Sequence, residues 1–238
     1  MQYMGSKNRI AKHLLPIMNK DRENRVWVEP FVGGANMIDK VNGKRIGNDS
    51  HKYLVALLKA LQKGWVPPTE ISKENYYDIK NYPDKYTDEL VGFVGFLCSF
   101  GGKWWGGYAF NKKNDNYADR GSRVLTKQAK NFAGIEFICG NYLEMTIPQN
   151  SLIYCDPPYR GTTKYKDTFD SNAFWQWCRD AANEGHLVFV SEYNAPDDFI
   201  CVKEIEHKTI LDKNSQYKRI EKLFRYKELK DGTNTISE

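Results

Sequence analysis

Short apolar runs alternate with helix-length amphipathic segments along most of this chain. That alternation predicts a parallel sheet wrapped by helices. The 238 residues are enough for one sizeable α/β domain with an insertion, or for two small domains. We expect strands at about 25–29, 45–48, 136–139, 151–155, 187–191, 201–205 and 222–226. We expect helices at 7–18, 35–41, 52–62, 126–131 and 171–183.

The alternation breaks between residues 64 and 123. This stretch is rich in Tyr, Lys, Asn and Gly, contains a helix-like apolar piece at 90–100, and includes the glycine-rich run 101–107. We therefore predict a small, largely helical insertion at 64–123. The main domain would be formed by residues 1–63 and 124–238.

Composition restricts where such a chain works. The 35 Lys and Arg against 30 Asp and Glu give a net charge of +5 and a pI near 8.8, which mildly favours a polyanionic partner. Five cysteines without a C-x-x-C pair indicate reduced intracellular thiols rather than zinc or disulfides. The four histidines lack ligand spacing, so no metal is expected. Without an apolar leader or an 18-residue uncharged stretch, we expect a cytoplasmic protein with no membrane span.

Residues 156–159, Asp-Pro-Pro-Tyr, follow an expected strand and carry the clearest chemistry. Both prolines fix φ and lack an N–H, so a rigid backbone carbonyl can face a pocket beside the Asp156 carboxylate. These two acceptors suit the protons of an exocyclic amine, and the ring of Tyr159 suits stacking on its base. The alternative interpretation of Pro157 and Pro158 is a simple turn after a strand, with Tyr159 as an exposed aromatic residue.

A second motif lies where the first strand ends, at 29–34, Glu-Pro-Phe-Val-Gly-Gly. Gly33 and Gly34 allow a sharp turn and close approach to a ligand, although a strand-to-helix turn alone would also use them. Asp49 lies 20 residues beyond Glu29, a position that suits ribose hydroxyls or a helix cap. No Gly-Lys-Ser or Gly-Lys-Thr follows, and Glu29 would repel phosphate. S-adenosylmethionine therefore suits this site better than a nucleoside triphosphate.

Together, four segments resemble the DNA adenine-N6 methyltransferases of the Dam-like (D12) class, which occur in bacteriophages and restriction-modification systems. The segments are 3–7 (Tyr-Met-Gly-Ser-Lys), 29–34, Asp49 and 156–159. The resemblance implies a Rossmann-like core of seven mostly parallel strands with helices on both faces. It also implies S-adenosylmethionine as cofactor, double-stranded DNA as partner, and a target-recognition insertion between the two halves. No oligomeric partner is implied.

The resemblance also implies roles for individual residues. Tyr3, Gly5 and Lys7 form the motif that contacts the methionine part of the cofactor, while Glu29, Phe31, Gly33 and Gly34 form the glycine-rich motif and Asp49 binds ribose. Tyr142 flanks the cofactor adenine, and Asn141 stands where the family has an acidic residue. Asp156, Pro157, Pro158 and Tyr159 form the catalytic motif, with Asp156 also beside the cofactor. A residue set near the target, 191–194 (Ser-Glu-Tyr-Asn), resembles a later family motif, although Glu192 is equally consistent with a surface acid.

Methyl transfer to an adenine amine implies a flipped-out base, because the amine is inaccessible in a stacked duplex. Asp156 and the Pro157 carbonyl would orient that amine for direct transfer, and Tyr159 would grip the base. No cysteine follows a proline, so the nucleophile of cytosine-C5 methylation is absent.

Contacts to DNA are expected mainly from basic and aromatic residues of the insertion. Trp104 and Trp105 are either base contacts or core residues, and the loop after the catalytic motif either closes over the nucleotide or stays solvated. The candidates are Lys103, Trp104, Trp105, Lys112, Lys113, Arg120, Arg123, Lys164 and Tyr165.

Several rival functions remain open at this stage. A cytosine-N4 methyltransferase typically has serine at the position of Asp156, and methyltransferases acting on RNA or on a protein glutamine typically have asparagine there. A catalytically silent nucleic-acid-binding protein on the same fold is a further alternative. Asp156 and the complete set of motifs favour the adenine-specific enzyme.

Overall fold

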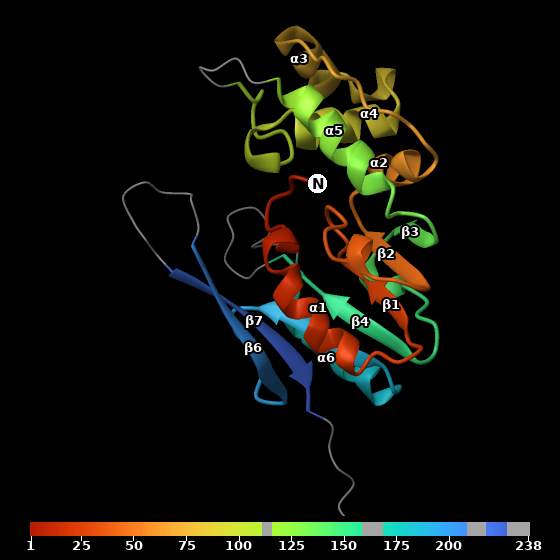
Figure 1. The fold of residues 1–238 in the computed structure, drawn as a ribbon, viewed down its shortest axis with the longest axis vertical. Coiled ribbons are helices and arrows are strands. Elements are labelled where there is room, and N and C mark those ends of the chain that lie inside the picture. Colours follow the sequence, from red (N-terminus) through yellow and green to blue (C-terminus); the bar gives the residue numbers. More distant parts are fainter. Residues whose placement is uncertain (111–115, 159–168, 209–217, 228–238) are drawn as a thin grey trace, which may run out of the picture.

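One mixed sheet organises the chain. The computed structural model describes residues 1–110, 116–158, 169–208 and 218–227 (Figure 1). Within those residues, seven strands join in the order β3-β2-β1-β4-β5-β7-β6. Their bounds are β1 Val26–Glu29, β2 Arg45–Asp49, β3 Ile135–Cys139, β4 Ser151–Cys155, β5 Leu187–Glu192, β6 Phe199–Lys208 and β7 Lys218–Tyr226.

Strand direction confirms the predicted, mostly parallel sheet. β1 pairs in parallel with β2 and β4, and further parallel pairs join β2 to β3 and β4 to β5. β7 runs antiparallel to both β5 and β6. β4 has its predicted bounds, whereas β6 spans ten residues and is longer than expected. The order of the strands reverses between β1 and β4, and ligands of such sheets bind at the carboxyl ends of the strands beside that reversal.

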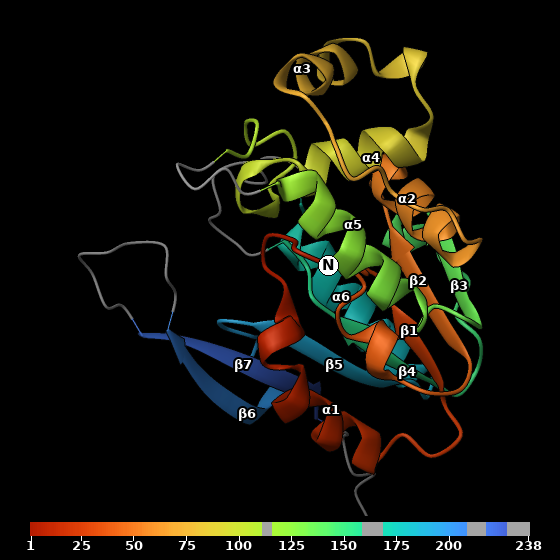
Figure 2. The same cartoon turned by 45° about the horizontal axis from the view of Figure 1, so that its top comes forward.

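Helices cover both faces of the sheet, as predicted. Alternate residues of β4 enter different cores: Leu152 and Tyr154 pack in one cluster with α1 (Ala11–Lys20), and Ile153 and Cys155 pack in another with α6 (Ser171–Asn183). Figures 1 and 2 show α1 lying across one face of the sheet. The two-residue alternation of buried side chains is what a sheet covered on both faces requires.

Two helices have the bounds that the sequence predicts, α2 (Lys52–Gln62) and α6. Both have side-chain caps: His51 Nδ1 accepts from the Leu54 amide at 3.3 Å, and the Asp170 carboxylate accepts from two amides of the first turn of α6. Such caps satisfy backbone donors that the helix itself leaves unpaired. The predicted first helix instead divides into the 3-10 turn η1 (Lys7–Arg9) and α1.

The helix predicted at 35–41 is wrong. Only the 3-10 turn η2 (Ile38–Lys40) forms there. Ala35 has a φ of 54°, in the left-handed region, because it completes the turn that begins at the two glycines. Val41 is already extended, which leaves too few residues for an α-helix.

The remaining helices are α3 (Lys73–Asn81), α4 (Asp88–Leu97) and α5 (Tyr117–Ala129). In Figures 1 and 2, α3 and α4 lie beyond one end of the sheet, and α4 and α5 contact α2, which itself packs against β2 and β3. Between them lie the 3-10 turns η3 (Pro83–Lys85) and η4 (Phe100–Gly102). The helix predicted at 126–131 is the last part of the longer α5. Since α5 crosses residue 123, the second boundary proposed for the insertion falls inside a helix, and the division into domains stays a prediction.

Glycines let α4 approach α2 closely. A Cβ at Gly92 would overlap the backbone oxygen of Tyr53, and one at Gly95 would overlap the indole of Trp104. The buried face of α4, from Val91 to Leu97, can therefore pack against the start of α2.

We predict that Gly92→Ala lowers the free energy of unfolding by at least about 1–3 kcal/mol, because backbone must shift to admit the methyl group. Urea denaturation monitored by circular dichroism measures the change. Gly140→Ala is the control, since a Cβ there would meet its nearest atom at an ordinary 3.8 Å. Equal stability of the two variants would contradict the close packing.

Candidate active site

The predicted motif residues meet at the carboxyl edge of the parallel strands. The glycine turn follows β1, Asp49 ends β2, and Asp156 follows β4. Asn141 and Tyr142 follow β3, at the 3-10 turn η5 (Tyr142–Glu144). β1 lies between β2 and β4, so these residues flank the reversal of strand order.

The N-terminal segment packs directly on the glycine turn. Gly33 has a φ of 48°, and a Cβ there would lie 3.0 Å from the Tyr3 ring. A Cβ at Gly34 would lie 2.9 Å from the Tyr3 Cβ. Tyr3 also contacts Phe96 of α4, with ring centroids 5.4 Å apart. Only glycines permit this approach, so the two motifs that the sequence places 30 residues apart form one surface.

Lys7 is buried at the centre of the site, with 4% of its surface exposed. Its Nζ lies 2.8 Å from Asp156 Oδ1 and 3.6 Å from Glu221 Oε1, and it donates to the Gly5 carbonyl at 3.3 Å. Burial alone would lower the pKa of Lys7, but the two carboxylates outweigh it and raise the pKa. The ammonium group therefore stays charged beside the Asp156 side chain.

Asp49 supports the glycine turn from the neighbouring strand. Its carboxylate accepts from the Gly33 amide at 3.0 Å and from the His51 amide at 3.0 Å. Burial raises the pKa of Asp49, and these two hydrogen bonds oppose the rise. His51, rather than Asp49, supplies the side-chain cap of α2. The ribose contact of Asp49 stays a prediction.

Glu29 lies behind the turn rather than on its surface. It is buried, and its Oε1 accepts from the Trp27 indole N–H at 2.7 Å. Burial raises the pKa of Glu29 well above its ordinary value.

Aromatic side chains line the site on the side of α6. The Phe31 ring lies 4.9 Å from that of Tyr142, 5.9 Å from that of Phe169 and 5.8 Å from that of Phe174. Burial raises the pKa of Tyr142 to about 12, so its hydroxyl stays protonated. This apolar cluster suits the flat face of a nucleobase.

Asn141 is exposed and caps η5, its Oδ1 accepting from the Leu143 amide at 3.2 Å. Sequence reasoning missed its neighbour Asn48, a buried amide that donates to the Pro30 and Gly140 carbonyls at 3.0 Å each. Asn48 thus joins the turn after β1 to the turn after β3. The available signal was an amide side chain within the short strand β2, where it is buried with its neighbours.

Glu192, at the end of β5, lies near Lys7, Asp156 and Glu221 and is only partly exposed. It is half-buried and accepts from the Tyr193 amide at 2.8 Å. Burial, together with repulsion from Asp156 and Glu221, raises its pKa to about 7, although Lys7 opposes the rise. Beside it, Ser191 is hydrogen-bonded to the Tyr154 hydroxyl at 2.9 Å.

The residues expected to contact DNA fall into three groups. Trp104 and Trp105 are half-buried: Trp104 meets the His51 ring edge-on at 4.3 Å, and Trp105 meets Tyr76 at 5.3 Å. Lys103 is exposed, whereas Arg120 lies over the Tyr117 ring and Arg123 pairs with Asp119 at 2.6 Å. The third group lies outside the described residues and comprises Lys112, Lys113, Lys164 and Tyr165. Tyr159 of the catalytic motif also lies outside the described residues.

Among the described residues, no group of three or more His, Cys, Asp or Glu side chains could hold a metal ion. In that part of the chain, no helix combines the length and the apolar character needed to cross a bilayer.

We predict that Glu192→Gln stabilises the protein at pH 8 more than at pH 5. The folded chain keeps this proton up to about pH 7, whereas the unfolded chain releases it near the ordinary value of 4.5. Stability from this group is thus present at low pH and is lost as the pH rises between these values. Glutamine cannot ionise, so the variant does not lose this stability as the pH rises.

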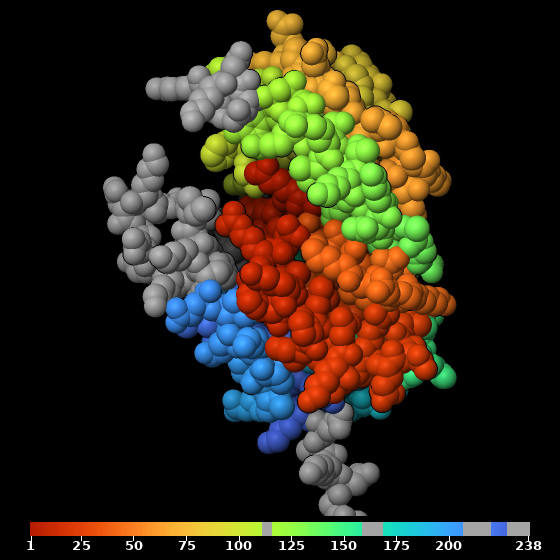
Figure 3. Space-filling view, viewed as in Figure 1, coloured from red at the N-terminus to blue at the C-terminus, as the bar shows by residue number. Residues whose placement is uncertain are grey.

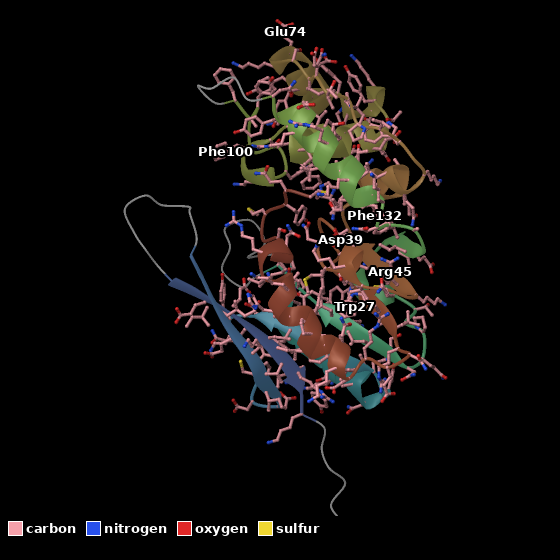
Figure 4. The ribbon with its side chains drawn as sticks, in the orientation of Figure 1. Trp27, Asp39, Arg45, Glu74, Phe100 and Phe132 are labelled. Carbon is pink, nitrogen blue, oxygen red and sulfur yellow. The ribbon has the colours of Figure 1, made fainter. Side chains whose placement is uncertain are left out.

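Chemical denaturation at both pH values measures the difference. Glu74→Gln is the control, because Glu74 is exposed on α3, far from the sheet (Figure 4). An effect of Glu192→Gln that is the same at pH 5 and pH 8 would show that Glu192 has no raised pKa.

Sequence and structure comparisons find similarity to methyltransferases. The chain is 23% identical over 259 residues to the type II methyltransferase M.FokI of Planomicrobium okeanokoites, covering 91% of this chain and 38% of that protein. It is 27% identical over 217 residues to the DNA adenine methylase of Vibrio cholerae, covering 79% of this chain and 74% of that protein. The chain therefore spans well under half the length of M.FokI. Among solved structures, a putative RNA methyltransferase from Pyrococcus horikoshii has a TM-score of 0.43 at 11% identity, covering 93% of this chain and 83% of that one.

A family model matches the part of the chain that holds the N-terminal motif, the glycine turn and Asp49. The model is that of the D12 class N6 adenine-specific DNA methyltransferase, and it matches residues 3–92. Over these residues, the chain is similar to the D12 class N6 adenine-specific DNA methyltransferase family.

Proposed function

We propose that the chain is a site-specific DNA methyltransferase that transfers a methyl group from S-adenosylmethionine to the N6 amino group of adenine in double-stranded DNA. The observation that carries the proposal is the contact of Lys7 with Asp156, which joins the cofactor motif to the catalytic motif at 2.8 Å. The enzyme would act in the cytoplasm of a bacterial cell or of a phage-infected host, within or outside a restriction-modification system.

The residues present fit this cofactor. The glycine turn, closed by Tyr3, leaves backbone rather than side chains at the end of β1. Asp49 suits the ribose hydroxyls, and the cluster of Phe31 and Tyr142 suits the adenine ring. Carboxyl groups outnumber cations around Lys7, which favours a ligand with positive charge. When bound, S-adenosylmethionine supplies an electrophilic methyl group on sulfur.

Asp156 and the Pro157 carbonyl would position the target amine. Asp156 is half-buried at the open end of β4, and Pro157 is buried beside it. Hydrogen bonds from both amino protons to these acceptors would hold the nitrogen with its lone pair directed at the methyl group. Positioning of this kind supplies a large share of the acceleration in transfer reactions. The role of Tyr159 in holding the flipped base is part of the same proposal.

DNA would lie against the helical segment that holds α3, α4 and α5. Lys103 is exposed there, and Phe100 is 65% exposed at the margin of this segment (Figure 4). Figure 3 shows the N-terminal residues reaching the surface between α5 and the strands β6 and β7. A duplex bound across this face would therefore meet both the helical segment and the edge that carries Asp156.

The function is tested by incubating the protein with S-adenosylmethionine and DNA, digesting the DNA to nucleosides and measuring them by mass spectrometry. N6-methyladenine is expected. N4-methylcytosine instead, methylation of RNA only, or no product would each contradict the proposal.

We predict that Asp156→Ala slows methyl transfer by several orders of magnitude while cofactor binding changes much less, because the variant lacks the group that orients the amine. Single-turnover transfer of labelled methyl to DNA and calorimetric titration of the cofactor measure the two effects. Asp197→Ala, at an exposed position, is the control. Transfer by Asp156→Ala at nearly the control rate would exclude Asp156 from the mechanism.

We predict that alanine at Lys103, Arg120 or Arg123 reduces the salt dependence of DNA binding. Each substitution that removes a bond to phosphate should lower the slope of log K against log salt by about one unit. Binding to a labelled duplex at several salt concentrations gives the slopes. Lys63→Ala, beside the outer strand β3, should leave the slope unchanged. Wild-type slopes for all three variants would place the phosphate contacts elsewhere.

A further inference from the structure

The site contains a buried acid, Glu221, that belongs to none of the sequence motifs described above. Glu221 lies in β7, with 6% of its surface exposed. β7 runs antiparallel to β5, and Lys222 of β7 lies opposite Glu192 in the register of the two strands, at the carboxyl end of β5. The beginning of β7 therefore reaches the edge of the sheet where Asp156 lies. Glu221 shares its face of the strand with the fully buried Leu223, so a carboxylate stands where the pattern of the strand calls for an apolar residue.

Glu221 and Asp156 approach the same cation from different segments. The Lys7 ammonium lies 2.8 Å from Asp156 Oδ1 and 3.6 Å from Glu221 Oε1. The three residues are far apart in the sequence, and all three lie at one edge of the sheet. Because Lys7 is buried, its position is set by these contacts rather than by solvent.

We infer that Glu221 is a positioning residue for methyl transfer that acts through Lys7, an inference that rests on the proposed function. Its carboxylate draws the ammonium toward β7, so that Lys7 holds Asp156 from one side without taking up the whole of its negative charge. Asp156 then keeps the acceptor strength that the target amine requires. With Glu221 neutral, Asp156 would be the carboxylate that attracts Lys7 most strongly, and the closer ammonium would weaken Asp156 as an acceptor.

A purely structural role for Glu221 predicts a different behaviour. Removing one partner of a buried ion pair destabilises the fold, because the other charge is left without compensation. In Glu221→Gln, Lys7 would keep Asp156, and the introduced glutamine would keep the shape and a hydrogen-bonding group. The substitution should therefore affect the reaction more than the stability, and only while Lys7 is present.

The test compares Glu221→Gln, Lys7→Met and the double variant, with Glu204→Gln as the matched control. Glu204 lies on the adjacent strand β6, is exposed, and pairs with Lys222 at 3.4 Å. Single-turnover transfer of labelled methyl to DNA gives the rate, calorimetry gives the cofactor affinity, and circular dichroism gives the folded fraction. Rates are expressed per folded molecule.

We expect Glu221→Gln to slow single-turnover transfer by about 10- to 100-fold, the scale of a small misplacement of a catalytic group. Cofactor affinity should change far less, and Glu204→Gln should transfer at the wild-type rate. In the Lys7→Met background, Glu221→Gln should cause no further loss, because its effect passes through Lys7.

Two results would overturn the inference: a wild-type rate per folded molecule for Glu221→Gln, or the same loss with and without Lys7. A wild-type chain that forms no N6-methyladenine overturns the proposed function and this inference together. A wild-type chain that forms it beside an equally fast Glu221→Gln variant overturns only the role of Glu221.

Discussion

A single buried cation joins the parts of this site. Lys7 enters from the N-terminal turn η1, Asp156 from the loop after β4 and Glu221 from the antiparallel strand β7. A buried ammonium requires compensating negative charge. Here Glu221 in β7 and Asp156, directly after β4, provide it. The N-terminal segment is thereby held across the edge of the sheet, which in turn places Tyr3 over the glycine turn. Loss of the cation would remove the tie between this segment and the two carboxylates.

The helical segment is tied to the same edge at two points. The backbone of Gln2 and Tyr3 packs so tightly on Gly102 that a Cβ there would lie 2.9 Å from the Gln2 carbonyl. Trp104 meets His51, whose amide donates to Asp49. Side chains near the proposed DNA surface therefore contact residues of the proposed cofactor site. Small shifts in packed interiors are transmitted because such interiors have little free volume. These contacts join the proposed DNA surface to the proposed cofactor site.

Local signals in the sequence predict the elements, while contacts between distant segments decide the site. β4, α2 and α6 have their expected bounds, since each combines an apolar pattern with clear limits. The helix expected at 35–41 fails because Ala35 adopts a left-handed conformation that the alanine itself does not signal. The role of Glu221 in the site could not be predicted from the sequence, because its partner Lys7 lies 214 residues away in the chain. Such pairings depend on strand order, which the sequence pattern leaves open.

The acidic character of the edge distinguishes the proposed cofactor from its product. Glu29 and Glu192 have raised pKa values chiefly because burial disfavours their charged forms, with other carboxylates adding to the effect. A cationic ligand beside them would favour ionisation, whereas a neutral ligand would leave them protonated. S-adenosylmethionine carries its positive charge on sulfur, and the product that has given up the methyl group does not. The same carboxyl groups that retain the charged cofactor would therefore hold the product less strongly, which favours its exchange after each transfer.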